Sequence, residues 1–318
     1  MKLSYKILLS LSTFLLAVVL SIGIYFTHKI QNYPSLTLDK VYNDIKQMSI
    51  YGLKKNQRTP GDFGFNNYKN VIYFNNNKMT LKGWYIEAPV KSSKCYVIYH
   101  GRSSNRLKTL TYLRLLKELK IDKTYNIFLP DLRNSGESSK AITAMGYYVA
   151  DDIYNSLQFL KNKKNNSEFI LHGFSMGALG ITLALQRYEK ELKNLSIKKL
   201  ILDSPVSNVK ELIKYEVTRR MVYPSFLAVI GSNALNMKLG FSLNSMRLSH
   251  TLKNTKISTI IVSAENDPKA PQRFLNIETF NLPKSHVKFV SFKTGNHGRL
   301  FLKEEKKYSE TISSFIND

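Results

Sequence analysis

A serine flanked by two glycines is the pattern in this chain that most directly predicts chemistry. The pentapeptide Gly-Phe-Ser-Met-Gly occupies residues 173–177. It follows an apolar run at 169–171 and precedes a segment, 178–186, whose composition predicts a helix. A serine on so sharp a strand-to-helix turn has a strained backbone and needs small neighbours. The spacing predicts a nucleophilic Ser175; the alternative is a serine that only caps the helix.

A serine hydroxyl becomes a nucleophile when a base removes its proton, and the candidate bases here are the six histidines. His297 is the one that lies downstream of Ser175 on a loop, 294–298, expected at the carboxyl end of a strand. From such a loop an imidazole can reach the serine turn. His297 is therefore the predicted base, and the alternative role for it is to cap the last helix.

An acid must orient that imidazole, and three carboxylates follow predicted strands. Asp267 follows the strand 257–264, next to the strand that leads to His297, and is the preferred acid. Asp203 follows the preceding strand and would otherwise fix the turn after it. Glu265 is the third possibility.

Short apolar runs alternate with helical patterns along most of the chain. The predicted strands are 71–74, 79–86, 95–99, 126–129, 168–171, 199–202, 257–264 and 287–292, and the predicted helices between and after them are 107–119, 147–162, 178–186, 271–280 and 300–316. The first two strands flank an Asn-rich turn and predict an antiparallel hairpin. The later alternation predicts an α/β fold, a mostly parallel sheet with helices on both faces and ligands at the carboxyl ends of its strands.

Two segments depart from this alternation. Residues 206–255 show no clear strand but two helical stretches, 209–221 and 226–239. Their apolar faces contain Leu212, Ile213, Met221, Phe226, Leu227 and Leu235. This insertion is interpreted either as a lid over the site or as a plain crossover helix with a long loop. Residues 29–70 are predicted to be a connector with one short helix, 38–48.

The N-terminal segment is apolar and long enough to cross a membrane. Residues 7–26 carry no charge, and 20 helical residues span about 30 Å. We expect an uncleaved anchor at residues 1–28, followed by the connector and a catalytic domain at 71–318. Lys2 and Lys6 favour a cytoplasmic N-terminus and hence a single-pass protein with its domain outside the cytoplasm. The alternative is a signal peptide and a secreted protein.

The composition is basic but ordinary for a globular domain. The 318 residues include 47 Lys and Arg against 23 Asp and Glu, which gives a net charge of +24. No dense basic block or nucleic-acid motif accompanies this charge, so nucleic-acid binding is not expected. Cys95 is the single cysteine, which excludes an intramolecular disulfide. No metal site is predicted from cysteine and histidine spacing, and no cofactor is expected.

Taken in order, these motifs are similar to those of a known superfamily. They are His100-Gly101 after an early strand, Asp-x-Arg-x-x-Gly-x-Ser at 131–138, Gly-x-Ser-x-Gly at 173–177, Asp267 and His297. From residue 71 onward the chain resembles the α/β-hydrolase superfamily. It also resembles a membrane-anchored subset, of serine aminopeptidase or esterase type, whose hairpin ends in Gly-Trp-Tyr, here at 83–85.

The resemblance implies roles for particular residues. Ser175, Asp267 and His297 would form a catalytic triad, and the backbone N–H groups of Arg102 and Met176 would bind the oxyanion. Met176 is also placed there by its position at a helix N-terminus. Arg102 departs from the small or apolar residue frequent in such proteins. Either its positive charge would favour anionic substrates, or its side chain would simply point to solvent.

The expected activity is that of a serine hydrolase. Its substrates would be carboxylic esters, either small molecules or lipid-like acyl esters near a membrane. The enzyme alternatives are a serine peptidase and a thioesterase. The non-enzyme alternative is a membrane-tethered binding protein on the same fold, although an intact set of Ser175, Asp267 and His297 argues against it. The sequence does not indicate an oligomeric state.

Overall fold

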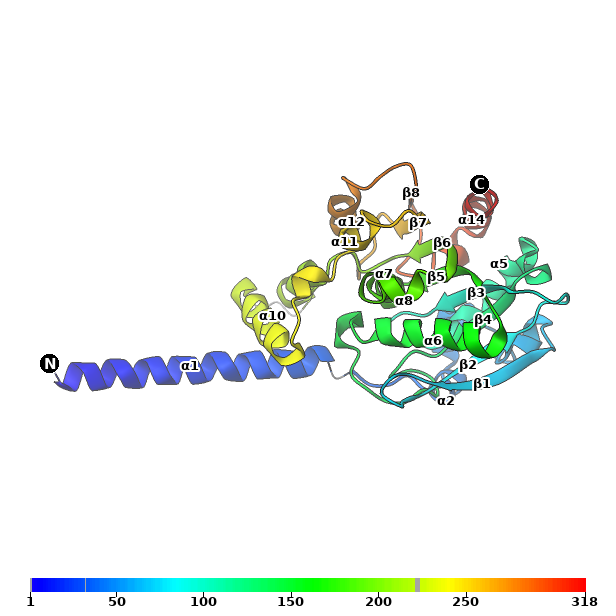
Figure 1. The fold of residues 1–318 in the computed structure, drawn as a ribbon. Helices are drawn as coiled ribbons and strands as arrows, with labels where there is room; N and C mark the ends of the chain where they lie inside the picture. The colour runs from blue at the N-terminus through cyan, green and yellow to red at the C-terminus, as the bar shows by residue number, and fades with distance from the viewer. Residues whose placement is uncertain (1, 32, 221–223) are drawn as a thin grey trace. The chain divides into compact units, whose positions relative to one another are not determined.

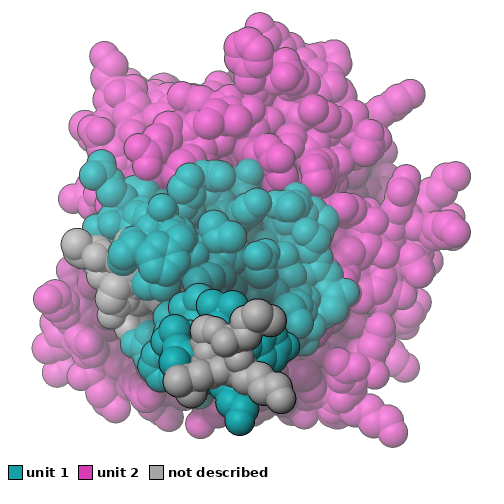
Figure 2. Space-filling view, turned by 90° about the vertical axis from the view of Figure 1, so that its left-hand side faces the viewer, with its two compact units in different colours: residues 1–33, 208–246 teal, residues 34–207, 247–318 magenta. Residues whose placement is uncertain are grey.

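The structure, a computed structural model, describes residues 2–31, 33–220 and 224–318 (Figure 1). The chain forms two compact units. The smaller unit combines residues 1–33 with 208–246, and the larger contains residues 34–207 and 247–318 (Figure 2). Every residue proposed for chemistry belongs to the larger unit.

Eight strands form one sheet in the larger unit. They are β1 (Tyr68–Phe74), β2 (Thr80–Ile86), β3 (Lys94–Tyr99), β4 (Asn126–Pro130), β5 (Glu168–Phe174), β6 (Ser196–Asp203), β7 (Ser258–Ala264) and β8 (Val287–Phe292). Their order across the sheet is β1-β2-β4-β3-β5-β6-β7-β8. β2 runs antiparallel to β1 and β4, and the remaining neighbours are parallel. The predicted sheet with its N-terminal hairpin is confirmed.

Helices of the larger unit lie before, between and after these strands in the chain. The α-helices are α2 (Leu38–Tyr42), α3 (Ile45–Ile50), α4 (Leu107–Leu110), α5 (Tyr112–Glu118), α6 (Val149–Lys164), α7 (Met176–Arg187), α8 (Glu189–Leu192), α11 (Leu248–Leu252), α12 (Gln272–Thr279), α13 (Leu300–Lys303) and α14 (Glu305–Asn317). Short 3₁₀ turns are η1 (Pro60–Phe63), η2 (Ile121–Lys123) and η3 (Ala144–Gly146).

The two faces of the sheet are covered by different helices, as expected (Figure 1). Alternate residues of a strand point to opposite faces. Tyr96 of β3 belongs to the same buried cluster as Tyr112 of α5 and Tyr308 of α14. Tyr99, three residues further along β3, points the other way and hydrogen-bonds Ser156 of α6 at 2.7 Å. The central strands are therefore buried on both sides, which explains why β3, β4 and β5 are mostly apolar.

Three helices predicted as continuous are interrupted. The predicted helix 38–48 breaks at Asp44, whose carboxylate caps α3 by accepting from Gln47 N–H. The predicted helix 107–119 divides at Thr111, whose hydroxyl donates to the Tyr51 carbonyl at 2.6 Å. The predicted helix 300–316 divides at Glu304, whose carboxylate accepts from Thr294 N–H and Oγ1. At each break the side chain of the named residue therefore forms a hydrogen bond outside the regular backbone pattern of the helix.

The segment predicted to be a connector packs as part of the larger unit from residue 34 onward. Leu38, Val41, Met48, Tyr51 and Phe65 are buried in the same cluster as the sheet residues. The Gly136 N–H donates to the Leu36 carbonyl at 2.9 Å, which ties this segment to the loop after β4.

The smaller unit is helical in its described residues. Its elements are α1 (Lys2–Gln31), α9 (Val209–Tyr215), the π-helical turn η4 (Glu216–Arg220), α10 (Ser225–Leu239) and the 3₁₀ turn η5 (Leu243–Ser245). Among the described residues, one helix, α1, is long and apolar enough to cross a membrane, over Tyr5–Tyr25. Of the apolar residues predicted for the insertion, Ile213 and Leu235 are buried and Phe226 is exposed. Met221 lies outside the described residues.

Candidate active site

Ser175 lies at the junction of β5 and α7 in a strained backbone conformation, as its sequence context predicts. Its φ is 53° and its ψ is −113°, a region that residues other than glycine rarely occupy. The flanking glycines are required by close contacts. A Cβ on Gly173 would stand 2.7 Å from the backbone of Ala178, and one on Gly177 would stand 2.5 Å from the His100 carbonyl oxygen.

The structure brings Ser175, His297 and Asp267 into one hydrogen-bonded row. His297 Nε2 lies 2.7 Å from Ser175 Oγ, and His297 Nδ1 lies 2.8 Å from Asp267 Oδ2. A carboxylate only accepts, so Nδ1 carries the proton and Nε2 is free to accept the serine proton. Ser175 makes no side-chain capping bond to α7, which excludes the alternative of a simple helix cap. The row is mostly buried, with 12% of the His297 side chain exposed.

Asp267, and not Asp203, faces His297. The Asp267 side chain is fully buried, and its second oxygen, Oδ1, accepts from the N–H groups of Lys269 and Ala270 at 2.8 and 2.9 Å. These bonds fix the carboxylate with Oδ2 turned to the imidazole. Asp203 is buried elsewhere, and Glu265 is exposed on the surface.

The two proposed oxyanion donors, the N–H groups of Met176 and Arg102, belong to segments that lie close to Ser175. Met176 is the first residue of α7, so its N–H has no acceptor one turn earlier in the helix. The turn before Arg102 passes close to the serine, because a Cβ on Gly101 would stand 3.1 Å from Ser175 Cβ. The Arg102 guanidinium is half-buried, 3.6 Å from Met145 Sδ, so the side chain does not simply extend into solvent.

The 131–138 motif stabilises its own loop. The buried Asp131 carboxylate accepts from Arg106 N–H and pairs with the Arg106 guanidinium, both at 2.8 Å. A side chain on Gly136 would overlap that carboxylate, which explains the glycine. Arg133 forms a two-bond pair with Asp152 at 2.9 and 2.7 Å. These buried pairs hold the loop beside the strand ends.

The His100 side chain joins the end of β3 to this loop. Its Nε2 accepts from Leu132 N–H at 3.0 Å, and its Nδ1 donates to the Gly101 carbonyl at 2.8 Å. Burial lowers the pKa of His100, so the ring is held neutral.

A buried polar chain behind the row was not predicted. Tyr308 donates to Asp203 Oδ2 at 2.9 Å, so its oxygen accepts from His172 Nε2 at 3.2 Å, and His172 Nδ1 accepts from Tyr96 at 3.0 Å. Burial lowers the pKa of His172 to about 3 and raises that of Asp203 to about 6. The chain ends at Ser204, next to the His297 loop.

Lys108 is a second unpredicted residue at the site. Its ammonium lies 5.4 Å from the Phe174 ring, and a Cβ on Gly298 would stand 2.6 Å from it. Burial lowers the pKa of Lys108 to about 8, partly offset by the carboxylates of Asp203 and Asp267. A single lysine within a predicted helix does not indicate from the sequence that its ammonium lies buried beside the proposed catalytic residues.

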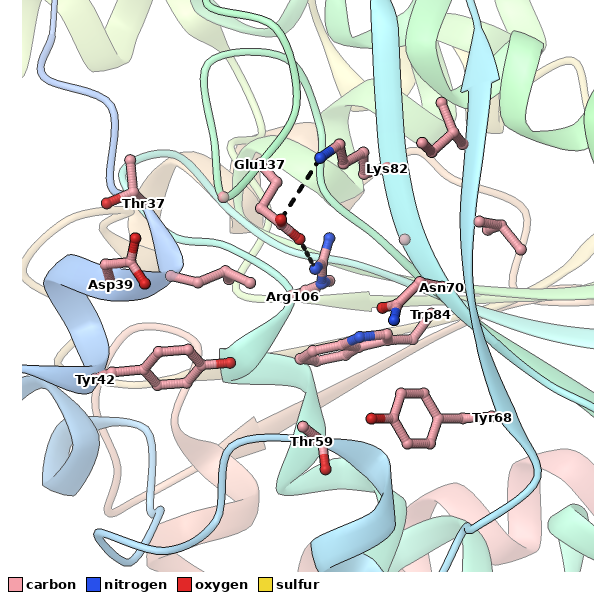
Figure 3. A pocket seen from close by; sticks show the side chains of 15 residues that line it. Thr37, Asp39, Tyr42, Thr59, Tyr68, Asn70, Lys82, Trp84, Arg106 and Glu137 are labelled. Carbon is pink, nitrogen blue, oxygen red and sulfur yellow. Dashed lines mark hydrogen bonds and ion pairs between the residues drawn. The ribbon is translucent and has the colours of Figure 1, made fainter.

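A pocket of about 690 Å³ lies away from the row. It is lined by residues of β1, β2 and the α2 segment, and none of Ser175, Asp267 and His297 lines it (Figure 3). Its Arg106 guanidinium stacks 4.4 Å above Trp84 and pairs with Glu137, which also meets Lys82. Its central charges are therefore neutralised by protein partners. Among the described residues, no cluster of histidine, cysteine and carboxylate side chains could hold a metal ion.

Comparison with known proteins identifies the family. The family model described as the α/β hydrolase fold matches residues 97–303, and the chain belongs to this family. An uncharacterised Bacillus subtilis protein, YqkD, is 23% identical over 325 residues, covering 98% of this chain and 97% of YqkD. An esterase from Pyrococcus furiosus has a TM-score of 0.60 at 20% identity, covering 81% of this chain and 93% of its own. An esterase from Exiguobacterium antarcticum has a TM-score of 0.54 at 18% identity, covering 79% and 100%.

Proposed function

We propose that this protein is a serine hydrolase that cleaves carboxylic esters. Ser175 is the nucleophile, His297 the base and Asp267 the orienting acid. The observation that supports this most is the His297 imidazole, which bonds Ser175 at 2.7 Å and Asp267 at 2.8 Å through its two nitrogens. The α/β hydrolase family of the chain adds support for an enzyme of hydrolase type.

The proposed reaction has two steps. His297 Nε2 takes the Ser175 proton while Oγ bonds to the ester carbonyl carbon, and the N–H groups of Arg102 and Met176 bind the oxyanion. His297 then protonates the departing alcohol as its C–O bond breaks. Water, deprotonated by His297, attacks the acyl-serine, releases the acid and restores the hydroxyl. Asp267 stays ionised and stabilises the imidazolium. Each oxyanion donor is worth roughly 3 kcal/mol in comparable enzymes.

We also propose that α1 attaches the enzyme to a membrane. The support is its 21-residue apolar stretch, Tyr5–Tyr25, most of whose side chains are exposed in the structure. The lysines at its start favour a domain outside the cytoplasm. Membrane attachment would place the site near small-molecule or lipid-like acyl esters.

A comparison of three substrate types tests the activity. Purified full-length protein is assayed with a p-nitrophenyl ester, the matching thioester and an aminoacyl p-nitroanilide. The proposal predicts that the ester is cleaved fastest and that Ser175→Ala abolishes turnover at an unchanged unfolding temperature. Faster anilide cleavage would indicate a peptidase, and faster thioester cleavage a thioesterase. No turnover of any substrate by the wild-type protein would favour a binding protein.

A further inference from the structure

Helix α10 exposes an apolar face. Phe226, Val229 and Met237 are 59%, 55% and 82% exposed, and together with the exposed Asn233 they form one stripe at helical spacing. The opposite side of the helix is buried at Ala228, Gly231, Ser232 and Leu235. A helix with apolar residues on its exposed side needs a partner for that side.

Helix α1 runs beside α10 and packs against it (Figure 1). A Cβ on Gly23 would stand 2.9 Å from Ala234 Cβ and 3.7 Å from Ile230 Cγ2. Contact through glycine and alanine brings two backbones close together and is typical of helices that associate in membranes. Gly23 itself lies within the apolar stretch Tyr5–Tyr25.

The position of this contact places α10 close to any membrane that α1 spans. Gly23 is two residues from the end of the apolar stretch, which is about 3 Å along the helix. Val19 and Ile22 are half-buried, so contact extends over the last turns of the stretch. A bilayer covering the whole stretch would therefore also reach α10.

The charge of the insertion suits a lipid surface. Residues 208–246 contain five basic and two acidic residues. The basic residues are Lys210, Lys214, Arg219, Arg220 and Lys238. An apolar stripe combined with an excess of lysine and arginine is typical of helices that lie in the headgroup region, with their apolar side about 5–10 Å deep.

We propose that α10 is a second membrane contact of this protein. It lies at the level of the lipid headgroups beside the end of α1, with Phe226, Val229 and Met237 among the acyl chains. This inference rests on the membrane attachment proposed above for α1. In this proposal the exposed stripe of α10 contacts lipid and does not contact a substrate bound at Ser175.

Spin labels on the full-length protein test the proposal. Phe226→Cys, Val229→Cys and Met237→Cys are each labelled with a nitroxide, since the native Cys95 is buried and burial raises its thiol pKa. The proteins are reconstituted in vesicles of phosphatidylcholine and phosphatidylglycerol. Leu15→Cys in α1 is the lipid reference, and Lys306→Cys in α14, whose lysine side chain is 90% exposed, is the water reference. Power saturation compares accessibility to oxygen and to a water-soluble nickel chelate.

The expected oxygen-to-nickel ratio at the three stripe positions is severalfold above that at Lys306 and below that at Leu15, which lies at the middle of the apolar stretch. Ratios equal to that at Lys306, with a lipid-like Leu15, would overturn the proposal and leave attachment through α1 standing. A water-like Leu15 would overturn both. Ester turnover by the same preparations is measured in parallel, so failure of the proposed activity is seen separately.

Discussion

Ser204 Oγ accepts a hydrogen bond from the Gly298 backbone N–H at 2.9 Å and donates to Asp203 Oδ1 at 2.8 Å. Gly298 directly follows His297, so the loop that carries the imidazole is tied to the end of β6. The Ser175 N–H donates to the Asp203 carbonyl at 2.9 Å. The end of β6, at Asp203 and Ser204, is therefore hydrogen-bonded both to the loop of His297 and to the backbone of Ser175.

Removing the Ser204 hydroxyl should loosen the imidazole without touching substrate. For Ser204→Ala we expect kcat for ester hydrolysis to fall about tenfold, the equivalent of one hydrogen bond, with KM unchanged. Steady-state kinetics on a p-nitrophenyl ester measure both constants. An unchanged kcat together with a lower unfolding temperature would show that the bond serves stability alone.

Exchanging each buried aspartate for asparagine separates the orienting acid from its neighbour. Asp267→Asn should lower kcat by about three to four orders of magnitude, because the imidazole loses the carboxylate that fixes its tautomer. Asp203→Asn should lower kcat by no more than about tenfold and act mainly on stability, because Asp203 bonds Ser204 and Tyr308 and not His297. Kinetics of the two variants in parallel would refute the assignment if the order of the effects were reversed.

Asp203 should make stability depend on pH. Burial raises its pKa from 3.8 to about 6, so the folded state binds its proton more tightly than the unfolded state. This contribution is fully present below the unfolded pKa and is lost as pH rises through the folded pKa, a difference of roughly 3 kcal/mol. Relative to Asp203→Asn, the wild-type protein should therefore lose stability between about pH 4 and pH 6. Urea unfolding of both proteins across this range measures the difference, and a constant difference would contradict the prediction.

Replacing Gly136 by alanine should destabilise the protein more than replacing Gly240, although both glycines have a left-handed backbone conformation. Gly136 has φ +54°, and an added Cβ would overlap the Asp131 carboxylate; Gly240 has φ +69° with nothing within 4 Å. Gly240→Ala should cost only about 1 kcal/mol of unfolding free energy, the backbone strain alone. Gly136→Ala should cost about 3 kcal/mol or more, because it also breaks the buried pairing with Arg106. Equal losses in denaturant unfolding would contradict a special role for the carboxylate contact.

Much of the fold could be predicted because the central strands of the sheet are buried on both faces. Each of these parallel strands is then a short apolar run bounded by polar loops, as at Asn126–Pro130, where every residue is buried and the predicted strand, 126–129, ends one residue earlier. The strain at Ser175 could also be predicted. Glycines two residues before and two residues after a serine indicate a turn so sharp that larger side chains do not fit at 173 and 177. The break at Asp44 has a local signal in the sequence, because an aspartate followed three residues later by a glutamine is typical of a helix start. The helical spacing of apolar residues over 38–48 nevertheless favours one continuous helix.

Other features depend on contacts between distant parts of the chain. The helix break at Thr111 is fixed by the Tyr51 carbonyl, 60 residues earlier. The tie from Ser204 to Gly298 joins two loops 94 residues apart. The contact between Gly23 and Ala234 groups the insertion with the N-terminal helix. Patterns within a single segment contain no information on any of these pairings.

The central claim, that His297 activates Ser175 as a nucleophile, is tested most directly by covalent labelling. A fluorophosphonate probe reacts with an activated serine, and mass spectrometry of the digested protein locates the adduct. We expect one adduct, on Ser175, absent from Ser175→Ala and formed at least about a thousandfold more slowly by a folded His297→Ala variant. An adduct on another serine, or undiminished labelling of Ser175→Ala, would contradict the account.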